Sequence, residues 1–527
     1  MKKILALSIA LTAGAASAVV FRVTPYVQHP SPTAMTLKFI SDADVTATAS
    51  WWPEGKPEAV QSAVVSPRQA PELGYFGATH ALQYLPAMDP WQYRHRIEGL
   101  KPDAVYGYKV TLAGGPSYEN TFRTVPVKNR AVRFVAYADC ETQPSSTGDC
   151  ERWEDFAVDR DEDTATALNC TRRYFVDQTV GFASNVCTMA ARKPDFIVVA
   201  GDLAQKGSDQ THWDEYWRHN AGELNDVAGS TPIVPAIGNH DYHDYYTDAG
   251  ERGARKFLSY FELEPNGAAV DADQQQRFHR LDYGPVALIY LDLNNGLDGQ
   301  ADKDTNVYLS QKTCRAPDFN EGSEQYRWLE QQLADAQKKK AFTFLVSHQC
   351  PYSVGHHGRV NGDKGRVSSA AEDLSGVPTR CLMKLAKQYG VAAWICGHDE
   401  IYEHSLVDGV HVYDVGIGGD GLRGCKRTTE NNPYEVFRAH VDAPEVYDAT
   451  GTLVSGGKHY GHLEVNVEPK GKNVWTATLT PVHVFVSSNT VTHALSFERR
   501  TYADEVVLTN RLSASSGFCC TFCCTGR

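Results

Sequence analysis

The sequence predicts an all-β sandwich followed by a larger domain of the α/β (α+β) class. Residues 19–126 contain short strand-like runs separated by turns such as Leu100-Lys101-Pro102-Asp103, and none of them has a convincing helical period. After residue 127 the pattern changes to short apolar runs that alternate with helical segments. The chain of 527 residues also exceeds the roughly 100 to 200 residues of one domain, so at least two domains are expected.

The strands of the predicted sandwich are indicated by short runs bounded by turn residues. They are expected at residues 35–40, 46–52, 91–97, 106–112 and 121–125. A segment of about 100 residues with this pattern is typical of a complete two-sheet sandwich. Its sequence does not indicate a function, so we expect it to pack beside the larger second domain.

The second domain, residues 127–510, contains apolar runs with the length of buried strands. Six of them cover residues 132–138, 196–200, 231–236, 286–292, 342–347 and 391–395, and further strands are expected at 462–467, 473–479 and 483–486. Nearly all of the six are followed at once by polar, chemically capable side chains. Because ligand sites in α/β sheets lie beyond the carboxyl ends of strands, this placement predicts the position of the functional site.

The N-terminus has the layout of a secretory signal peptide. Lys2 and Lys3 precede an apolar stretch at residues 4–11, which leads to the small residues Ala16-Ser17-Ala18. We therefore expect residues 1–18 to be removed and the protein to be secreted, in the periplasm or outside the cell. Later segments do not approach the roughly 20 apolar residues of a transmembrane helix, so no membrane span is expected.

The charge balance restricts the classes of partner. The chain has 64 acidic and 51 basic residues and a formal net charge of −13, which argues against a general nucleic-acid-binding protein. A small phosphorylated substrate is compatible with this charge, because bound metal ions can outweigh the global field.

Thirteen cysteines in an exported chain predict disulfides, although their pairing cannot be deduced from the sequence. The best structural candidates lie in a polar, acidic, loop-like insertion at about residues 141–191. They are Cys150, Cys170 and Cys187. Cys396, inside an apolar run, is expected to be a buried free thiol. The cysteine-rich tail at residues 511–527 is expected to be disordered.

Polar motifs follow five of the predicted strands. They are Asp139-Cys140-Glu141, Gly201-Asp202, Gly238-Asn239-His240-Asp241, Ser347-His348 and Gly397-His398-Asp399-Glu400. A single histidine after a strand is usually structural, but carboxylate, amide and imidazole groups at successive strand ends converge at one edge of the sheet. Such oxygen and nitrogen ligands predict a site for one or two divalent metal ions.

With these five blocks in this order, the chain resembles the calcineurin-like metallophosphoesterases, and within them the purple acid phosphatase-like enzymes. Further similarities are Gln325-Tyr326-Arg327-Trp328-Leu329, Ile401-Tyr402-Glu403 and the glycine-rich Gly416-Ile417-Gly418-Gly419. The sandwich, with Gly99-Leu100-Lys101-Pro102 and Tyr106-Gly107-Tyr108, resembles a fibronectin type III-like domain. The resemblance covers about residues 20–467 and implies a two-sheet αββα sandwich for the catalytic domain.

The resemblance also implies a dinuclear metal centre. Asp202 would bridge the two ions, Asp139 would bind the first, and Asn239, His348 and His398 would complete the shell of the second. Two cations a few ångströms apart lower the pKa of a bound water and neutralise charge on the attacking and leaving groups.

Four further residues are candidates for contact with the substrate or for its support. The position of His240 after the asparagine ligand implies hydrogen bonding to phosphate, with proton donation as a further role. His356 and His357 match a histidine pair that borders the substrate in the family, where they would bind phosphate or protonate the leaving oxygen; a polar loop without a chemical role is the alternative. Asp241 is expected either to orient His240 or to cap a helix.

Three positions depart from the family pattern. Gln205 stands where purple acid phosphatases have the tyrosine that binds ferric iron, so a ferric-tyrosinate purple site is not expected. Glu141 and Glu400 stand where relatives have histidines. We hypothesise that the first site prefers a harder ion such as Mn²⁺, Mg²⁺ or Ca²⁺, while the second suits Zn²⁺, Fe²⁺ or Mn²⁺. The competing hypothesis is a degraded first site with a single metal or no turnover.

The leading functional hypothesis is metal-dependent hydrolysis of phosphate monoesters by a phosphatase of the acid or alkaline type. Two alternatives stay open: a phosphodiesterase or nucleotidase on the same site, and a non-catalytic surface or assembly protein that keeps the fold. The motifs do not separate them, because the metal site recognises the phosphoryl group while the surrounding loops select what is attached to it.

Overall fold

The computed structural model describes most of the two predicted domains. The described residues are 19–75, 89–142, 178–242, 251–294, 316–355, 357–358, 375–420, 422, 432–439, 446–457, 459–489, 491–492 and 494–511. The predicted signal peptide, the candidate His356, Cys150 and Cys170, and the cysteines of the C-terminal tail lie outside these residues.

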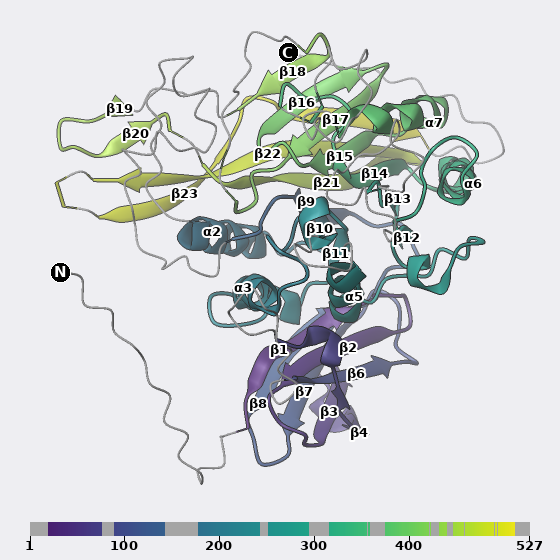
Figure 1. Cartoon of the computed structure of the whole chain (residues 1–527), viewed down its shortest axis with the longest axis vertical. Coiled ribbons are helices and arrows are strands. Elements are labelled where there is room, and N and C mark those ends of the chain that lie inside the picture. The colour runs from purple at the N-terminus through teal and green to yellow at the C-terminus, as the bar shows by residue number, and fades with distance from the viewer. Residues whose placement is uncertain are drawn as a thin grey trace.

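The N-terminal region is a sandwich of two four-stranded antiparallel sheets, drawn in purple and blue in Figure 1. One sheet has the order β1-β2-β6-β5 and the other the order β4-β3-β7-β8. The strands are β1 (Phe21–Gln28), β2 (Met35–Ser41), β3 (Ala47–Pro53), β4 (Gln61–Val65), β5 (Arg68–Gln69), β6 (Trp91–Ile97), β7 (Val105–Leu112) and β8 (Ser117–Arg123). Buried aromatic and aliphatic side chains of both sheets, among them Phe39, Tyr93 and Tyr108, form its core. The predicted all-β class of this region is confirmed.

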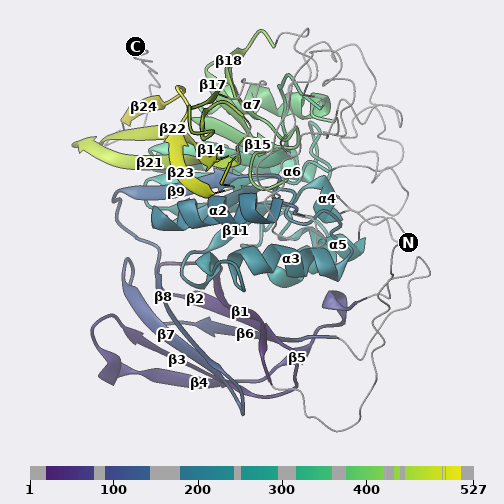
Figure 2. The same ribbon diagram turned by 90° about the vertical axis from the view of Figure 1, so that its left-hand side faces the viewer.

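Contacts between polar side chains and backbone groups join the sandwich to the catalytic domain. Tyr26 donates a hydrogen bond to the carbonyl of Tyr260 at 3.0 Å, and Tyr108 donates to the carbonyl of Gly229 at 2.7 Å. The guanidinium of Arg94 contacts both carboxylate oxygens of Glu262 at 2.6 Å. The sandwich is therefore fixed to the helices beneath the central sheets, as Figures 1 and 2 show.

His29 forms a pH-dependent part of this interface. Its Nδ1 lies 3.3 Å from Glu262 Oε1 and its Nε2 lies 2.5 Å from Glu264 Oε2. Carboxylate oxygens only accept hydrogen bonds, so both ring nitrogens must carry protons to satisfy them. The hydrogen bond to Glu262 accordingly raises the pKa of His29, against the opposing effects of its burial and of Arg96.

We expect the His29 contact to stabilise the protein at acidic pH. Because the folded-state pKa lies above the unfolded value, the contribution is fully present below about pH 6.5 and is lost as the pH rises through the folded pKa. After allowance for solvent screening it should be on the order of 0.5 kcal/mol. Urea unfolding at pH 5.5 and 8.5 should show this difference in the wild type and not in His29→Gln; an equal pH response in the two proteins would contradict the assignment.

The catalytic domain is built on two central sheets of seven strands each. The first central sheet has the order β11-β10-β9-β21-β22-β23, with β24 also paired to β22. Its strands are β9 (Val132–Tyr137), β10 (Phe196–Ala200), β11 (Ile233–Ala236), β21 (Gly461–Gly471), β22 (Val474–Ser488), β23 (Leu495–Thr501) and β24 (Val506–Arg511). Strands β9, β10 and β11 are parallel neighbours, so their carboxyl ends lie at one edge.

The second central sheet has the order β12-β13-β14-β15-β17-β16-β18. Its strands are β12 (His279–Tyr283), β13 (Val286–Tyr290), β14 (Phe342–Gln349), β15 (Ala393–Gly397), β16 (Tyr402–Val407), β17 (Val410–Val415) and β18 (Glu435–Arg438). Strands β13, β14, β15 and β17 run parallel. A separate two-stranded ribbon joins β19 (Val446–Tyr447) and β20 (Leu453–Ser455).

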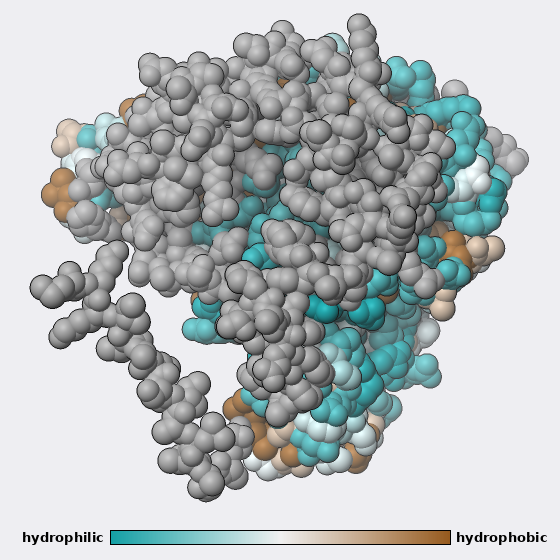
Figure 3. All heavy atoms as spheres, viewed as in Figure 1, coloured by the Kyte–Doolittle hydropathy of each residue, from teal (hydrophilic) through white to brown (hydrophobic). Residues whose placement is uncertain are grey.

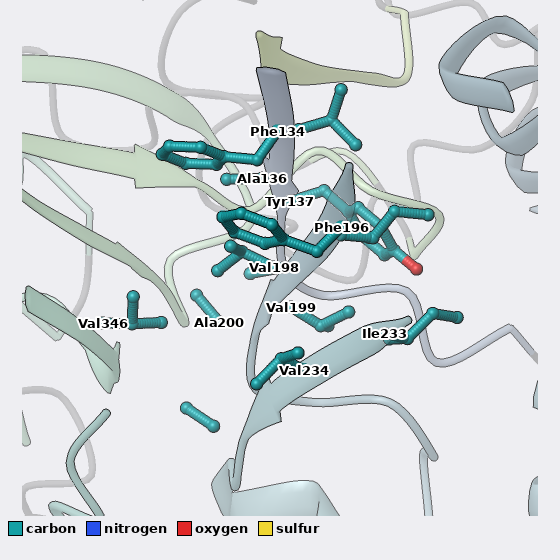
Figure 4. Packing of buried hydrophobic residues seen from close by; sticks show 14 of the residues in the cluster. Phe134, Ala136, Tyr137, Phe196, Val198, Val199, Ala200, Ile233, Val234 and Val346 are labelled. Atoms are coloured by element: carbon teal, nitrogen blue, oxygen red, sulfur yellow. The ribbon is translucent and has the colours of Figure 1, made fainter. Parts of the chain in front are cut away.

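The two central sheets pack face to face, with helices on their outer faces. Phe344 and Val346 of β14 belong to the core shared with the first central sheet, whereas Leu345 belongs to the core under α6 and α7. The rings of Phe134 and Phe344 meet edge to face across the two sheets at 5.3 Å, and Figure 4 shows Phe134 among other buried residues of this layer. Successive side chains of a strand point to opposite faces of the sheet, so the residues of β14 alternate between the two cores.

The helices complete the four layers that the resemblance implies. They are α2 (Gln178–Ala191), α3 (Gln210–Asn220), α4 (Asn239–Tyr242), α5 (Glu251–Tyr260), α6 (Glu324–Lys339) and α7 (Met383–Gln388). Figure 2 shows α2 and α3 between the first central sheet and the sandwich. Capping side chains set two of the helix starts: Asp209 accepts from the amide of Thr211, and Ser323 accepts from the amide of Tyr326. The predicted mixed fold class is confirmed.

Two predictions on local structure were wrong. Residues 178–191, predicted as part of a loop-like insertion, form helix α2, and Cys187 on this helix is an exposed free thiol rather than part of a disulfide. The two strands predicted at 473–479 and 483–486 are one strand, β22. Pro481 is tolerated there because it lies between Leu479, where the pairing with β24 ends, and Val482, where the pairing with β23 begins. Cys396 is a buried free thiol, as predicted.

The surface of the described residues is mostly hydrophilic on the face drawn in Figure 3, with apolar residues at the outer end of β19, β20 and β23 and on the sandwich. The exposed apolar residues include Val446 and Phe497, and isolated side chains of this kind are normal. Among the described residues, the helices are too short or too polar to cross a membrane.

Candidate metal centre

The five predicted motifs meet at the carboxyl ends of strands from both central sheets. Asp139 follows β9, Asp202 follows β10, and Asn239 follows β11, while His348 is the last residue but one of β14 and His398 follows β15. Backbone contacts join these ends: the amide of Asp139 donates to the carbonyl of Gly201 at 3.3 Å, and the amide of His398 donates to the carboxylate of Asp139 at 2.9 Å. The site is therefore built where the two sheets face each other.

The backbone of the site is strained. Asp139, Asp202, His398 and Glu400 all have positive φ angles, of 53°, 52°, 82° and 52°. Residues other than glycine rarely adopt this left-handed backbone conformation, and those that do cluster at functional sites. At Gly238 a side chain would be excluded, because an added Cβ would lie 2.1 Å from Asp202 Oδ1. The turns thus hold the polar side chains in one place at a cost in backbone energy.

Asp202, His348 and His398 form a nitrogen-containing group, called here the nitrogen cluster. The Nε2 atom of His348 lies 2.9 Å from Asp202 Oδ2 and 3.1 Å from Nδ1 of His398. The Nδ1 of His348 donates to the carbonyl of Ala200 at 2.9 Å, which leaves Nε2 directed at the other two residues. The three side chains are buried, and their ligand atoms lie within 4.8 Å of one another. One carboxylate and two imidazoles in this arrangement suit a Zn²⁺-like ion.

The pKa of His348 also indicates that the nitrogen cluster can hold a metal ion. Burial alone would lower the pKa of this histidine, but the carboxylates of Asp202 and Asp139 raise it to about 9. The cluster therefore favours a positive charge between these groups, which a metal ion can supply in place of the proton. Asn239 adds a further ligand candidate, since its Oδ1 is buried and has no hydrogen-bond partner among the residues that the structure describes.

Glu141, Glu400 and Asp420 form a second group, called here the carboxylate cluster. One oxygen from each lies within 4.8 Å of the others. Two unit charges 4 Å apart repel by about 4 kcal/mol near a protein surface. Burial first, and then the carboxylates of Asp420, Asp202 and Asp139, raise the pKa of Glu141 well above its usual range. Bound cations would relieve this repulsion.

The sequence did not indicate Asp420. Only the glycine-rich segment at residues 416–419, directly before it, resembled a family landmark, and that resemblance assigned no ligand to the residue that follows. Asp139, predicted to bind the first ion, contributes to the raised pKa of both Glu141 and His348. Both of its oxygens accept the amide of His398, at 3.1 and 2.9 Å. Burial raises the pKa of Asp139 to about 7.

His240 and Gln205 lie beside the nitrogen cluster. The backbone amide of His240 donates to Asp202 Oδ1 at 2.9 Å, and its ring Nδ1 donates to the carbonyl of Gln205 at 3.0 Å. One ligand atom of His240 also lies within 4.8 Å of those of Glu141 and Asp202. The side-chain oxygen of Gln205 is buried, and within the described part of the chain it has no hydrogen-bond partner. Gln205 thus positions His240 through its backbone, a contact that the sequence did not predict.

Asp241 supports the site through the backbone. Its Oδ1 accepts the amides of Leu203 and Ala204 at 2.9 and 3.2 Å, and its Oδ2 accepts the amide of Gly238 at 2.9 Å. These amides belong to the loops that carry Asp202 and Asn239. Asp241 is the third residue of α4, so it does not cap this helix as an N-cap residue would.

His357 packs behind the nitrogen cluster. Its ring centroid lies 3.8 Å from that of His398, and the hydroxyl of Ser375 lies 3.1 Å from Nδ1 of His357 and 2.6 Å from Nε2 of His398. The backbone amide of His357 donates to Asp399 at 2.9 Å. These contacts place His357 where it orients a predicted metal ligand. Ser375 belongs to no motif and was not predicted from the sequence.

Part of the chain matches a known protein family. Residues 174–402 match the family model described as calcineurin-like phosphoesterase. The chain contains a calcineurin-like phosphoesterase domain. The matched residues include Asp202, Asn239, His348 and His398, while Asp139 and Glu141 precede the match and Asp420 follows it.

Curated relatives are distant. An uncharacterized protein of Mycobacterium tuberculosis is 23% identical over 59% of this chain and 50% of its own length. Tartrate-resistant acid phosphatase type 5 of Oryctolagus cuniculus is 31% identical over 33% of this chain and 48% of its own length. Probable inactive purple acid phosphatase 1 of Arabidopsis thaliana is 23% identical over 59% of this chain and 43% of its own length. This chain thus spans about half the length of the curated relatives it matches.

Solved structures share the fold of almost the whole chain. Purple acid phosphatase PPD1 from yellow lupin seeds superposes with a TM-score of 0.58 at 15% identity and covers 91% of this chain and 73% of its own. PhoD superposes with a TM-score of 0.58 at 12% identity and covers 96% of this chain and 94% of its own. At these identities the likeness shows a shared fold, and it confirms the predicted purple acid phosphatase-like architecture.

Proposed function

We propose that this protein is a metal-dependent phosphomonoesterase that acts outside the cytoplasm on small phosphorylated substrates. The observation that carries the proposal is the nitrogen cluster, in which Asp202 Oδ2, His348 Nε2 and His398 Nδ1 face one another in a buried site. The extracellular location follows from the predicted signal peptide at residues 1–18. The family match supports hydrolysis of phosphate esters, and the choice of monoesters is our inference.

The residues of the site fit two divalent ions with different ligand preferences. The nitrogen cluster with Asn239 suits Zn²⁺, Fe²⁺ or Mn²⁺, and the oxygen-rich side around Glu141 and Glu400 suits Mn²⁺, Mg²⁺ or Ca²⁺. Gln205 offers no phenolate, so the proposal includes no ferric-tyrosinate charge transfer. When bound, such ions activate water and neutralise the charge on phosphoryl oxygens.

His240 supplies the proton chemistry of the proposal. Because Nδ1 donates to the carbonyl of Gln205, Nε2 is the ring nitrogen that can exchange a proton with the substrate. A histidine held in this way can hydrogen-bond a phosphoryl oxygen or donate a proton to the leaving oxygen. Ser375 and His357 hold the ring of His398 from behind, which fixes the orientation of a ligand rather than contacting substrate.

An assay with paired model esters tests the proposed substrate class. We expect the purified protein, supplied with Zn²⁺ and Mn²⁺, to hydrolyse p-nitrophenyl phosphate with a kcat/KM at least about tenfold above that for the bis-ester. A monoester has only one ester bond, so it presents more free, negatively charged phosphoryl oxygens to a cationic site than a diester does. The initial rates of nitrophenolate release measure both values.

The opposite preference would identify a phosphodiesterase on the same site. The failure to hydrolyse either ester across a panel of divalent metals would instead favour a non-catalytic protein that keeps the fold. Loss of activity in the presence of a chelator, and its recovery when metal is added back, serve as the control for a metal-dependent reaction.

A further inference from the structure

We propose that a cavity between the sandwich and the catalytic domain binds an uncharged, hydroxyl-rich ligand of the sugar class, and that His279 recognises this ligand. The inference goes beyond the proposed function, because the cavity is separate from the metal centre. Among the described residues, those that line the cavity include no member of the nitrogen cluster or of the carboxylate cluster.

The cavity has a volume of about 420 Å³ and is lined by both domains. His29 follows β1 of the sandwich, Ile233 begins β11, His279 begins β12, and Trp328 belongs to α6. Strands β11 and β12 are the edge strands of the first and the second central sheet. The cavity therefore lies where the edges of both sheets meet the sandwich. A domain interface is a common place for a small-molecule site, and the volume lies within the range of such sites.

His279 provides the observation that points to a ligand. Its side chain is 2% exposed, and neither ring nitrogen has a hydrogen-bond partner within the part of the chain that the structure describes. The ring stacks on that of Tyr290, with centroids 4.4 Å apart and planes 8° from parallel. Buried polar atoms are normally hydrogen-bonded to protein or to an ordered molecule. His279 thus offers two unused hydrogen-bonding atoms, held in a fixed plane, to an occupant of the cavity.

The protonation state of His279 restricts the chemistry of that occupant. Burial lowers the pKa of this histidine to about 3, and His29 acts in the same direction. The neutral imidazole has one N–H donor and one nitrogen acceptor. Hydroxyl groups match both, because each can donate and accept. A phosphate ester dianion offers only acceptors and an ammonium group only donors, so neither satisfies both nitrogens.

The charges around the cavity also favour an uncharged ligand. Four carboxylates line it, so an anion would be repelled. Each carboxylate already has a cationic partner, so the cavity does not require a cationic ligand, while the remaining lone pairs can accept hydrogen bonds from hydroxyl groups. The pairs are Glu262–Arg94, Glu264–His29, Asp282–Arg280 and Asp335–Arg280.

Apolar residues complete the walls of the cavity. They include Pro30, Pro32, Pro265, Leu281 and Trp328. Small-molecule sites commonly combine such walls with a few polar groups that fix orientation. A sugar ring carries hydroxyl groups on its edge and C–H groups on its faces, so it can use both kinds of surface at once.

Titration calorimetry on the purified full chain tests the proposal. We expect at least one of D-glucose, D-galactose, D-mannose and cellobiose to bind with a dissociation constant below about 1 mM. His279→Phe keeps an aromatic ring on Tyr290 and removes both ring nitrogens, so it should weaken this binding by at least about tenfold. Glu264→Ala, at a position whose side chain is 62% exposed, should weaken it by at least about threefold. Circular dichroism checks that both variants are folded.

His483→Phe is the matched control. His483 is also buried and stacked on a tyrosine, with its centroid 4.3 Å from that of Tyr502, but it lies on β22 and does not line the cavity. This variant should bind the sugar as tightly as the wild type.

The proposal is overturned if none of the four sugars binds, or if each folded site variant binds as tightly as the wild type. Tighter binding of putrescine or inorganic phosphate that His279→Phe abolishes would also overturn it, because the ligand would then be charged. Stronger binding of cellohexaose or maltohexaose than of glucose would identify a polysaccharide chain as the source of the sugar, and the reverse order a free sugar. These measurements involve no phosphoester hydrolysis, so their outcome is independent of the proposed function.

Discussion

Replacement of His348 by alanine is expected to lower kcat/KM for p-nitrophenyl phosphate by about three orders of magnitude. The Nε2 atom of His348 faces both Asp202 and His398, so the variant loses the central donor of the nitrogen cluster. Asp202, His398 and Asn239 would then be left to hold the ion without its central imidazole. Steady-state kinetics and elemental analysis of the same preparation should show activity and Zn²⁺ content falling together.

His95→Ala is the control for this experiment, since His95 lies on β6 of the sandwich, far from the metal centre in the sequence and in a different domain. It should keep the wild-type rate and metal content. A His348→Ala protein that keeps its full rate would refute every metal-based mechanism proposed here. A folded variant with an unchanged Zn²⁺ content would show that the ion is held elsewhere.

The hydrophobic pattern predicts six strands of the central sheets, β9, β10, β11, β13, β14 and β15, because each contains a continuous apolar run. It did not predict β12, β16, β17, β18, β23 and β24, in which polar residues stand among the apolar ones. The run at 196–200 coincides with β10, and its residues are fully buried between neighbouring strands. The same rule failed at Pro481, where a residue that usually ends a strand lies inside β22. Only the arrangement of β23 and β24 along one edge of β22 explains this position, and such an arrangement is not visible in a local pattern.

The five motifs that supply the predicted metal ligands share one property: each directly follows or ends an apolar strand. His348 and His398 meet because β14 and β15 are parallel neighbours, which a strand-end pattern predicts. Asp420 and Ser375 do not belong to a recognisable motif directly after a strand. They reach the site because a turn and a loop bring the chain back to it. The glycines before Asp420 were the available signal, because a close backbone approach requires them.

Substitution of Asp241 by asparagine is expected to destabilise the fold by about 2 kcal/mol and to reduce activity by about tenfold to a hundredfold. The carboxylate accepts three backbone amides, from Leu203, Ala204 and Gly238. Asparagine has one acceptor oxygen and one donor NH₂ group, so at least one amide must face another donor. The smallest loss leaves the oxygen with Leu203 and Ala204 and turns the NH₂ group toward Gly238.

Displacement of Gly238 would act directly on the metal centre, because the next residue is Asn239 and the amide of His240 is hydrogen-bonded to Asp202. Asp241→Asn should therefore weaken Zn²⁺ binding as well as lower the urea midpoint, although Asp241 itself is no ligand in this geometry. Glu498→Gln, on the exposed face of β23, should change neither quantity. A variant that loses stability and keeps wild-type Zn²⁺ affinity would show that Asp241 supports the fold alone, and that the loop carrying Asn239 holds its position without it.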